Sequence, residues 1–470
     1  MPINGSLLGV AAISRSDAWA VGHQVDGTVE GFSTLTEHWD GTSWAPIPSP
    51  NASSFSQELI DVSGVSSSDV WAVGWFYDEV GAERALIEHW DGSAWSLVPS
   101  PDPTPDGEEL VRLSGVDAVT GTDAWAVGSV VVAASVTRPR TLIEHWDGSS
   151  WSVVPSKNPS TVDDLLTGVS AASATDVWAV GVAGGGEPPL IEHWDGSSWR
   201  VAPAEAPDTR FFQLRAISAL PGGQAWAVGV DGDSPSSFIE HWDGSGWHIV
   251  PGPDASSGAT GLTDVSAVGS DDVWAVGPTT EDGTLIEHWD GSTWAVVRSP
   301  DLPTARGGFK SVSALPGAAW AVGSYIDEVE PAEHPIIGSW NGSVWRLFGP
   351  HARVLNLASL RITTSVRSAH PGDRVVFVAH ASNLDRHPVE LWVEYRDLVN
   401  FRFLREVCVD GPSPDTPSCE YSSVAPGEDI AVKVAGVVVG DGSYASLSFC
   451  VLRVDLPMKA CKTGRIRIVT

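Results

Sequence analysis

Two short sequence words recur seven times within residues 1–350 and constrain the fold more than any other feature of the chain. The first word ends in WAVG, and the second is EHWDGxxW or a variant of it. Successive WAVG words lie 46 to 54 residues apart, a spacing typical of β-propeller blades and longer than most solenoid repeats. The tryptophans of the first word are Trp19, Trp71, Trp125, Trp178, Trp226, Trp274 and Trp320.

One repeat, residues 166–204, predicts four short strands, because runs rich in Val, Ile and Trp alternate with Gly, Pro, Asp and Ser. The DG step in the second word favours a hairpin turn with positive φ. A single four-stranded sheet cannot bury both faces, whereas in a ring each sheet packs on its neighbours. The sequence therefore predicts an all-β fold, a seven-bladed β-propeller with four antiparallel strands per blade. The expected blades are residues 5–51, 58–101, 110–158, 164–207, 212–254, 260–301 and 308–350.

The phase of the repeat also predicts how the ring closes. The first strand begins near Leu7 and the last strand ends near Phe348. No strand is left over at either end of the repeat, so we expect no exchange of strands between the first and last blades. Closure would come from blade packing, with residues 1–6 as a further contributor.

Residues 354–470 have a different pattern. Short alternating runs are separated by the turn words HPGD and APGED, which predicts a second domain with an Ig-like β-sandwich fold. All four cysteines lie here as two pairs, each eleven residues apart, without CxxC spacing. This arrangement favours two disulfides over a zinc site. The cysteines are Cys408, Cys419, Cys450 and Cys461.

The second word resembles the Asp-box of sialidase-like propellers, whose pattern is S/T-x-D-x-G-x-x-W. Asp147, Gly148 and Trp151 match this pattern in kind, although no residue separates Asp147 from Gly148. The WAVG and HWDG words also resemble repeats of secreted bacterial propellers. These resemblances imply the fold, and they imply a structural role for the Asp, because Asp-boxes are structural in that family.

The second domain resembles a bacterial surface β-sandwich repeat of unknown function. HPGDRVVFVAHASN precedes Cys408 and Cys419, and VAPGEDIAVKV follows them, in the order of that family. The family's N-x-G word is replaced here by ASNLDRH. The resemblance implies that Cys408 pairs with Cys419, which leaves Cys450 for Cys461, and that the domain serves as a stalk or spacer.

The charge of the chain bears on its partners and its location. Its 59 acidic and 27 basic residues give a net charge of −32, which repels phosphate backbones and argues against nucleic-acid binding. No apolar run reaches the length of about 18 residues that a membrane helix needs, so we expect no membrane insertion. The opening residues do not form a convincing signal peptide. The disulfides and the resemblances nevertheless predict an extracellular or cell-surface location, and the oligomeric state is left open.

The second word contains residue types used in acid–base catalysis, such as Glu144, His145 and Asp147. Successive side chains of a strand face opposite sides, so Glu144 and His145 would not act on one substrate. The word is also intact in six copies, more than a catalytic centre needs. We therefore predict that its polar groups satisfy buried backbone and Trp N–H groups between blades. A repeated ligand pocket between blades, as in propeller lectins, is the alternative. The assigned structural residues are Glu88, His89, Trp90, Asp91, Glu144, His145, Trp146, Asp147, Glu192, His193, Trp194 and Asp195.

Variable loops lie at one end of the predicted ring and provide the candidate binding residues. Consecutive aromatics after the second WAVG word form either an exposed stacking platform or packing beneath a loop. Acidic loop residues permit calcium binding, but their spacing matches no known calcium loop, so no cofactor is predicted. The ligand-binding candidates are Trp75, Phe76, Tyr77, Asp78, Glu79, Tyr325, Asp327 and Glu328.

The predicted function is extracellular binding or adhesion, with a glycan or a protein recognised by the variable-loop face. One alternative is a carbohydrate-active enzyme, a glycoside hydrolase or polysaccharide lyase, that uses loop carboxylates at the channel mouth. Another is a purely structural surface protein. No catalytic residue is assigned, because no arginine cluster or tyrosine nucleophile typical of sialidases is recognisable.

Overall fold

In the computed structural model the chain forms two compact units, Met1–Ala352 and Arg353–Thr470. In the first unit the structure describes residues 4–101, 103, 109–132, 138–185, 188–205, 212–231, 237–253, 261–279, 283–299, 307–326 and 332–348. In the second it describes residues 361–365, 368–370, 374–382, 389–399, 401–409, 418–424, 429–438, 444–453 and 456–468.

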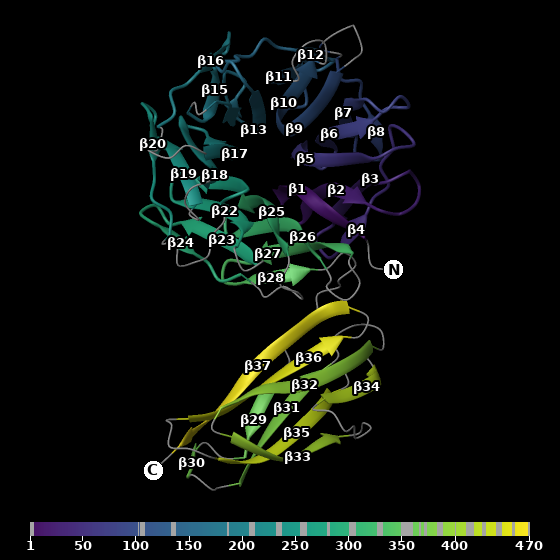
Figure 1. Ribbon diagram of the computed structural model, residues 1–470, viewed down its shortest axis with the longest axis vertical. Helices are drawn as coiled ribbons and strands as arrows, with labels where there is room; N and C mark the ends of the chain where they lie inside the picture. Colours follow the sequence, from purple (N-terminus) through teal and green to yellow (C-terminus); the bar gives the residue numbers. More distant parts are fainter. Residues whose placement is uncertain are drawn as a thin grey trace. The chain divides into compact units, whose positions relative to one another are not determined.

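The first unit is a ring of seven four-stranded antiparallel sheets, which confirms the predicted seven-bladed propeller (Figure 1). Blade one has β1 (Gly5–Ser14), β2 (Asp17–Gln24), β3 (Ser33–Trp39) and β4 (Trp44–Pro46). Blade two has β5 (Gln57–Ser66), β6 (Asp69–Tyr77), β7 (Glu83–Trp90) and β8 (Trp95–Leu97). Blade three has β9 (Glu109–Thr120), β10 (Asp123–Val132), β11 (Pro139–Trp146) and β12 (Trp151–Val153). Blade four has β13 (Asp164–Ser173), β14 (Asp176–Ala183), β15 (Leu190–Trp194) and β16 (Trp199–Val201).

The remaining blades follow the same order. Blade five has β17 (Phe212–Leu220), β18 (Gln224–Asp231), β19 (Ser237–Trp242) and β20 (Trp247–Ile249). Blade six has β21 (Asp264–Gly269), β22 (Asp272–Pro278), β23 (Thr284–Trp289) and β24 (Trp294–Val296). Blade seven has β25 (Gly307–Leu315), β26 (Ala318–Ile326), β27 (Glu333–Trp340) and β28 (Trp345–Phe348).

The first strand of every blade lies nearest the axis of the ring, where it contacts the first strands of both neighbouring blades (Figure 1). These strands have one edge without a strand partner, and side chains of the preceding blade satisfy backbone N–H groups there. Ala118 N donates to Ser63 Oγ at 3.1 Å, and Ala171 N donates to Asp117 Oδ2 at 2.8 Å. The same link recurs at Ser170, Ser218, Ser266 and Ser313.

The ring closes as the repeat phase predicted, without exchange of strands. Each sheet is built from four consecutive strands, including the first and last blades. At the junction of blades seven and one, Val10 N donates to Ser311 Oγ at 3.2 Å. Trp320 of blade seven lies 5.0 Å from Trp39 and 5.1 Å from Trp44 of blade one, measured between ring centroids. The junction therefore resembles the other interfaces between blades.

The glycine of WAVG is required by the close approach of the first two strands. A Cβ atom at Gly181 would lie 2.0 Å from the carbonyl oxygen of Leu165 on β13. All seven glycines of the word share this position, with a Cβ placed 1.9 to 2.3 Å from a backbone oxygen. The clash is with backbone, so a rotamer change cannot relieve it.

We expect Gly181→Ala to lower the free energy of unfolding by about 3 kcal/mol, because β13 and β14 must separate to admit the methyl group. Urea titration followed by far-UV circular dichroism measures the change. Gly269→Ala is the control, since its Cβ meets no atom closer than Asp271 Oδ1 at 3.5 Å, and we expect a change within about 0.5 kcal/mol. Equal losses in the two variants would contradict the steric explanation.

The second unit contains two β-sheets, in agreement with the predicted all-β sandwich. One sheet has the order β29-β31-β35-β33 and the other β30-β37-β36-β32-β34. The strands are β29 (Arg361–Thr364), β30 (Ser368–Ala369), β31 (Arg374–Ser382), β32 (Val389–Val399), β33 (Phe401–Val409), β34 (Ser418–Val424), β35 (Asp429–Val438), β36 (Tyr444–Arg453) and β37 (Leu456–Ile468). No helix in the described part of the chain has the length and apolar character needed to span a membrane.

The backbone positions of Cys450 and Cys461 are compatible with the disulfide expected between them. Cys450 on β36 lies directly opposite Cys461 on β37 in an antiparallel pair. Opposed Cα atoms in such a pair are about 4.5 to 5.5 Å apart, within the range of about 4.4 to 6.8 Å that a disulfide spans. Cys408 on β33 and Cys419 on β34 belong to different sheets. Both pairings stay predictions.

Candidate functional site

The glutamate of the EHW word connects adjacent blades. Glu144 is fully buried, and its Oε1 accepts a hydrogen bond from Ser100 Oγ, in the segment that follows blade two, at 2.9 Å. Burial raises the pKa of Glu144 to about 8. Glu192 likewise accepts a hydrogen bond from Lys157 N at 3.0 Å. The other fully buried glutamates of the word are Glu37, Glu88, Glu240 and Glu287.

The histidine of the word lies on the opposite face of the strand, as the alternation of side chains predicts. His145 Nε2 is 2.8 Å from Asp123 Oδ1, and the imidazole lies 4.2 Å from the Trp125 ring in the same blade. Blade seven lacks both members of this pair, because Ser339 and Ala318 occupy their positions. In blade five only the aspartate is replaced, by Gln224, and His241 still stacks on the ring of Trp226. The other histidines paired in this way are His38, His89, His193 and His288.

The tryptophans make most of the aromatic contacts between blades. Trp125 of blade three is 1% exposed and lies 5.0 Å from Trp194 and 5.4 Å from Trp199 of blade four. The same three-ring contact recurs around the propeller. The tryptophan of the WAVG word in one blade therefore packs against the two tryptophans of the EHWDGxxW word in the next blade.

The aspartate of the second word holds its own turn. Asp147 Oδ1 accepts hydrogen bonds from Ser149 N at 2.8 Å and Ser150 N at 2.9 Å, while Gly148 adopts a φ of 90°. The Ser149 hydroxyl is the first of the hydrogen bonds that lower the pKa of Asp147 to about 2. Asn341 accepts the equivalent bonds in blade seven, so the turn needs an oxygen acceptor but no charge.

These contacts support a structural role for the second word and correct its details. We predicted that Glu, His and Asp all satisfy buried groups between blades, and this is wrong for two of them. Only the glutamate makes hydrogen bonds between blades, whereas His145 and Asp147 act within one blade. Trp125 Nε1 has no hydrogen-bond partner among the described residues. Proximity of acid–base residue types in sequence therefore does not bring them to one site.

The predicted aromatic platform is mostly packing beneath a loop. Trp75 is 8% exposed, and its indole Nε1 donates to Glu58 Oε2 at 3.0 Å. Tyr77 lies 5.1 Å from the Trp75 ring, and Phe76 lines a pocket between blades two and three. Tyr325 is also buried, at 5% exposure. We call the end of the ring that carries the loops between the second and third strands the loop end. The aromatic candidates lie in or just below this end.

The acidic loop candidates are bound to protein groups where the structure describes them. Asp78 Oδ1 accepts from Ala82 N at 2.9 Å, and Asp78 Oδ2 accepts from Arg84 Nε at 2.9 Å. Glu79 accepts a hydrogen bond from Ser54. The candidates Asp327 and Glu328 lie outside the described residues. Within the described ranges, no group of three or more His, Cys, Asp or Glu is arranged to hold a metal ion.

The structure brings together a polar group that the sequence did not reveal. His23 Nδ1 lies 2.6 Å from Glu58 Oε1, and His23 Nε2 lies 3.8 Å from Glu333 Oε2. Lys310 Nζ lies 3.5 Å from Glu333 Oε1 and donates to Ser6 Oγ at 2.8 Å. We call His23, Glu58, Lys310 and Glu333 the axial cluster, because β25, β27, β2 and β5 bring them together near the axis at the loop end.

The charged network continues into blade three. Arg112 Nε lies 2.9 Å from Glu83 Oε1, and the Arg112 guanidinium carbon lies 5.0 Å from the centre of the Trp75 ring. The Arg112 side chain is 44% exposed, so a cationic group is accessible beside the axial cluster. Blades seven, one, two and three thus supply a polar sector to the loop end.

Blades four to six differ at the equivalent positions. The residue that follows the WAVG glycine is His23, Trp75 or Ser324 in blades one, two and seven, but Val182, Val230 or Pro278 in blades four, five and six. The residue type at this position therefore differs between the two sides of the ring, with polar or aromatic residues in blades seven, one and two and apolar residues in blades four to six. That difference is the sequence signal from which the axial cluster could have been found.

A hollow of about 550 Å³ adjoins the axial cluster between blades six and seven. Lys310, Glu333, Ser324 and Tyr325 contribute to its lining, together with backbone of Gly308. Its volume lies within the range of small-ligand pockets, about 300 to 1,000 Å³. The hollow and the cluster together form the candidate functional site.

The carboxylates of the axial cluster are held in their ionised form. Burial alone would raise the pKa of Glu58, but hydrogen bonds from His23 and Trp75 lower it below its usual value. Burial alone would also raise the pKa of Glu333. The hydrogen bond from the Ser324 hydroxyl and the charge of Lys310 stabilise the anion, and the pKa of Glu333 is lowered as a result. The site therefore offers fixed anionic acceptors beside a cationic donor.

Three further carboxyl groups of the inner strands have raised pKa values and a structural role. Asp61 accepts from Val116 N at 2.9 Å, and Asp264 accepts from Val312 N at 2.8 Å. Burial, followed by the charges of Asp264 and Asp117, raises the pKa of Asp61 to about 7. These groups connect neighbouring inner strands.

Comparisons with known proteins give distant structural similarities only. No protein-family model matches the chain, and no curated protein sequence matches it. A fucose-specific lectin from Aleuria aurantia is 13% identical with a TM-score of 0.39, over 63% of this chain and 96% of the lectin. A Trypanosoma rangeli sialidase is 10% identical with a TM-score of 0.38, over 97% of this chain and 83% of the sialidase. A Pyrococcus horikoshii acylaminoacyl peptidase is 10% identical with a TM-score of 0.47, over 81% of this chain and 58% of the peptidase. Similarity at this level carries no information on function.

Proposed function

We propose that the propeller is an extracellular binding module that recognises a glycan at the axial cluster and the adjoining hollow. The observation that carries this proposal is a set of half-exposed donors and acceptors held in fixed relative positions. Lys310 and Glu333 are 39% and 34% exposed, and each is anchored by a second polar contact. Such groups can bind a polar ligand at little further cost in side-chain entropy.

Glycan chemistry fits this arrangement better than an apolar ligand does. Every sugar hydroxyl both donates and accepts, and the axial cluster presents carboxylate acceptors beside an ammonium donor. The Arg112 guanidinium adds a second accessible cationic donor beside the axial cluster, next to Trp75. A ligand that carries a dense net charge fits less well, because the chain is strongly acidic while the accessible cations are few.

The ionisation state of the carboxyl groups at the site favours binding over hydrolysis. A glycoside hydrolase needs one carboxyl with a raised pKa as general acid beside an ionised partner. Glu58 and Glu333 both have lowered pKa values. Glu144, whose pKa is raised to about 8, is sealed between blades. Among the described residues, therefore, no carboxyl group with a raised pKa lines the hollow at the axial cluster.

The test is a glycan array probed with the purified full chain, followed by calorimetric titration of the strongest glycan. We expect Lys310→Ala and Glu333→Gln each to weaken binding by about tenfold, which corresponds to about 1.4 kcal/mol. Each removes one charge-assisted hydrogen bond from the rim of the hollow.

Asp147→Asn is the matched control, because it removes a charge at the opposite end of the ring and Asn341 already fills that role in blade seven. We expect this variant to bind like the wild type. Absence of glycan binding on the array, or equal binding by all variants, would overturn the proposal. Absence of any ligand would favour the purely structural alternative.

A further inference from the structure

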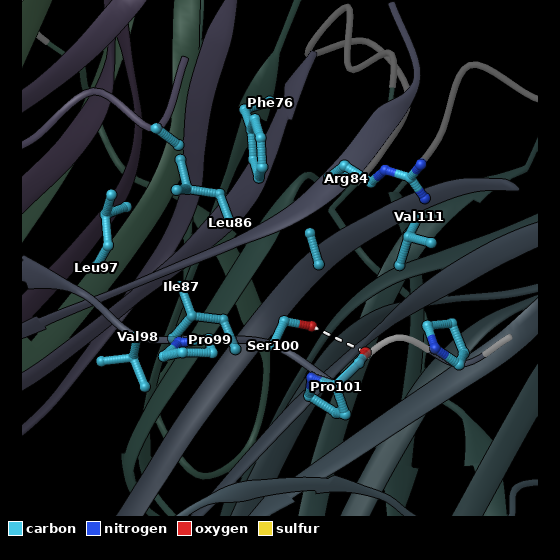
Figure 2. Close-up of a pocket in the computed structure, with 13 residues that line it drawn as sticks. Phe76, Arg84, Leu86, Ile87, Leu97, Val98, Pro99, Ser100, Pro101 and Val111 are labelled. Carbon is cyan, nitrogen blue, oxygen red and sulfur yellow. Dashed lines mark hydrogen bonds between the residues drawn. The ribbon is translucent and has the colours of Figure 1, made fainter. Parts of the chain in front are cut away.

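A pocket of about 400 Å³ lies between blades two and three, apart from the axial cluster. Figure 2 shows Phe76 and Arg84 on one side of the pocket and Ser100 with Pro101 on the other. Most of its lining is apolar, and Ile87 contributes to the same lining. The size suits a small ligand with one ring.

Three of the other blades, one, three and six, share a hydrogen bond that blade two lacks at the equivalent position. In blade three the Thr141 hydroxyl lies 2.6 Å from Ser156 Oγ, in the segment that follows the blade. Thr34 and Ser49 form the same bond in blade one at 2.7 Å. Thr284 and Ser299 are bonded in blade six.

Blade two departs from this arrangement at one position. Ala85 occupies the place of the threonine, three residues before the glutamate of the EHW word. The Ser100 hydroxyl has no hydroxyl partner at Ala85, and its acceptors are Glu144 Oε1 at 2.9 Å and the carbonyl oxygen of Pro101 at 3.3 Å (Figure 2). The small Ala85 side chain lines the pocket together with Phe76 and Val98. Blades four, five and seven also lack the threonine and have Pro189, Ser237 and Pro335 there, so alanine at this position is particular to blade two.

The charges at the pocket indicate the class of ligand. Arg84 is the one charged side chain of the described lining, and its Nε lies 2.9 Å from Asp78 Oδ2. The pair is close to neutral, so the pocket does not select for a charged ligand. Phe76 and the proline rings of Pro99 and Pro101 offer flat apolar surfaces, while the Ser100 hydroxyl, whose proton is donated to Glu144 and Pro101, offers its oxygen as an acceptor.

We infer that this pocket is a binding site for a neutral, ring-shaped apolar molecule that carries a hydroxyl group, of the phenol class. The ring packs on Phe76 and the prolines, and the hydroxyl lies at the Ser100 side of the pocket. The site is independent of glycan recognition at the axial cluster, so either can fail without the other.

The test is a fluorine NMR titration of the full chain with 4-fluorophenol. We expect saturable binding to the wild type and about tenfold weaker binding to Ala85→Thr, which introduces the residue present in blades one, three and six. Ala94→Thr is the matched control, because it makes the same substitution in an exposed turn of blade two where blade six has Thr293. This control should bind like the wild type.

A second variant keeps the test decisive if Ala85→Thr does not fold. Phe76→Leu preserves an apolar wall but removes the ring, and we expect it to weaken binding by about fivefold. Binding that is equal in all variants, or absent in the wild type, would overturn the inference. Tighter binding of 4-fluorobenzoate than of 4-fluorophenol would overturn the assignment to neutral ligands.

Discussion

The protein is expected to be more stable near pH 5.5 than near pH 8.5, by several kcal/mol in the free energy of unfolding. Burial raises the pKa of Glu144 to about 8 and of Glu192 to about 7, against an ordinary value of 4.5. Between these values the folded state keeps protons that the unfolded state has lost. Stability therefore falls as the pH rises from about 4.5 and stops falling above about 8.

Several groups contribute in the same direction, because each pKa unit corresponds to about 1.4 kcal/mol for one group. The turn aspartates do not offset the effect. Asp147, with a pKa of about 2, is already ionised in both states throughout this range. The carboxyl groups with a raised pKa are Glu37, Glu88, Glu144, Glu192, Glu240, Glu287, Asp61, Asp117 and Asp264.

Glu144→Gln isolates one of these contributions. The amide oxygen can still accept the hydrogen bond from Ser100, so stability near pH 5.5 should match the wild type. Near pH 8.5 the variant should be more stable by about 1 to 2 kcal/mol, because it carries no carboxyl to ionise. Urea unfolding at both pH values measures this, with Asp147→Asn as the control that keeps the wild-type pH dependence. A wild-type stability that rises with pH over this range would refute the explanation.

Trp125→Ala is expected to destabilise the propeller by about 3 to 5 kcal/mol. Its ring lies against His145 of its own blade and against Trp194 and Trp199 of the next, so removal leaves a cavity at an interface between blades. The free energy of unfolding, from urea titration monitored by tryptophan fluorescence and circular dichroism, measures the loss.

Val153→Ala in the same blade is the control for Trp125→Ala. The Val153 side chain is 43% exposed, and we expect its truncation to change stability by less than about 0.5 kcal/mol. A Trp125→Ala loss below about 1 kcal/mol would show that the blades are held together mainly by the hydrogen bonds between their inner strands.

The repeat was sufficient to predict the architecture, because each copy carries a complete blade. Strand number, blade number, the glycine turn after Asp147 and closure without strand exchange all follow from the phase and composition of two words. The roles of individual polar residues were harder to predict. Sequence alternation placed Glu144 and His145 on opposite faces, but it did not indicate that Asp123 is the partner of His145.

The axial cluster could not be predicted from local pattern. Lys310 and Ser6 are 304 residues apart in sequence and are joined only when the ring closes. Trp75 was a candidate because it falls outside the repeat, and the structure instead makes it the buried donor to Glu58. The informative signal in both cases is a residue that departs from most of its equivalents in the other blades, and its role depends on which blade lies beside it.

Closure without strand exchange has a consequence for how the number of blades can change. Every blade is one uninterrupted segment of chain, and the interface between blades seven and one is of the same kind as the rest. Duplication or deletion of one such segment would add or remove a whole sheet without breaking any strand pair. The architecture can therefore gain or lose a unit in a single genetic step, and the new ring needs only a small change in the angle between neighbouring sheets.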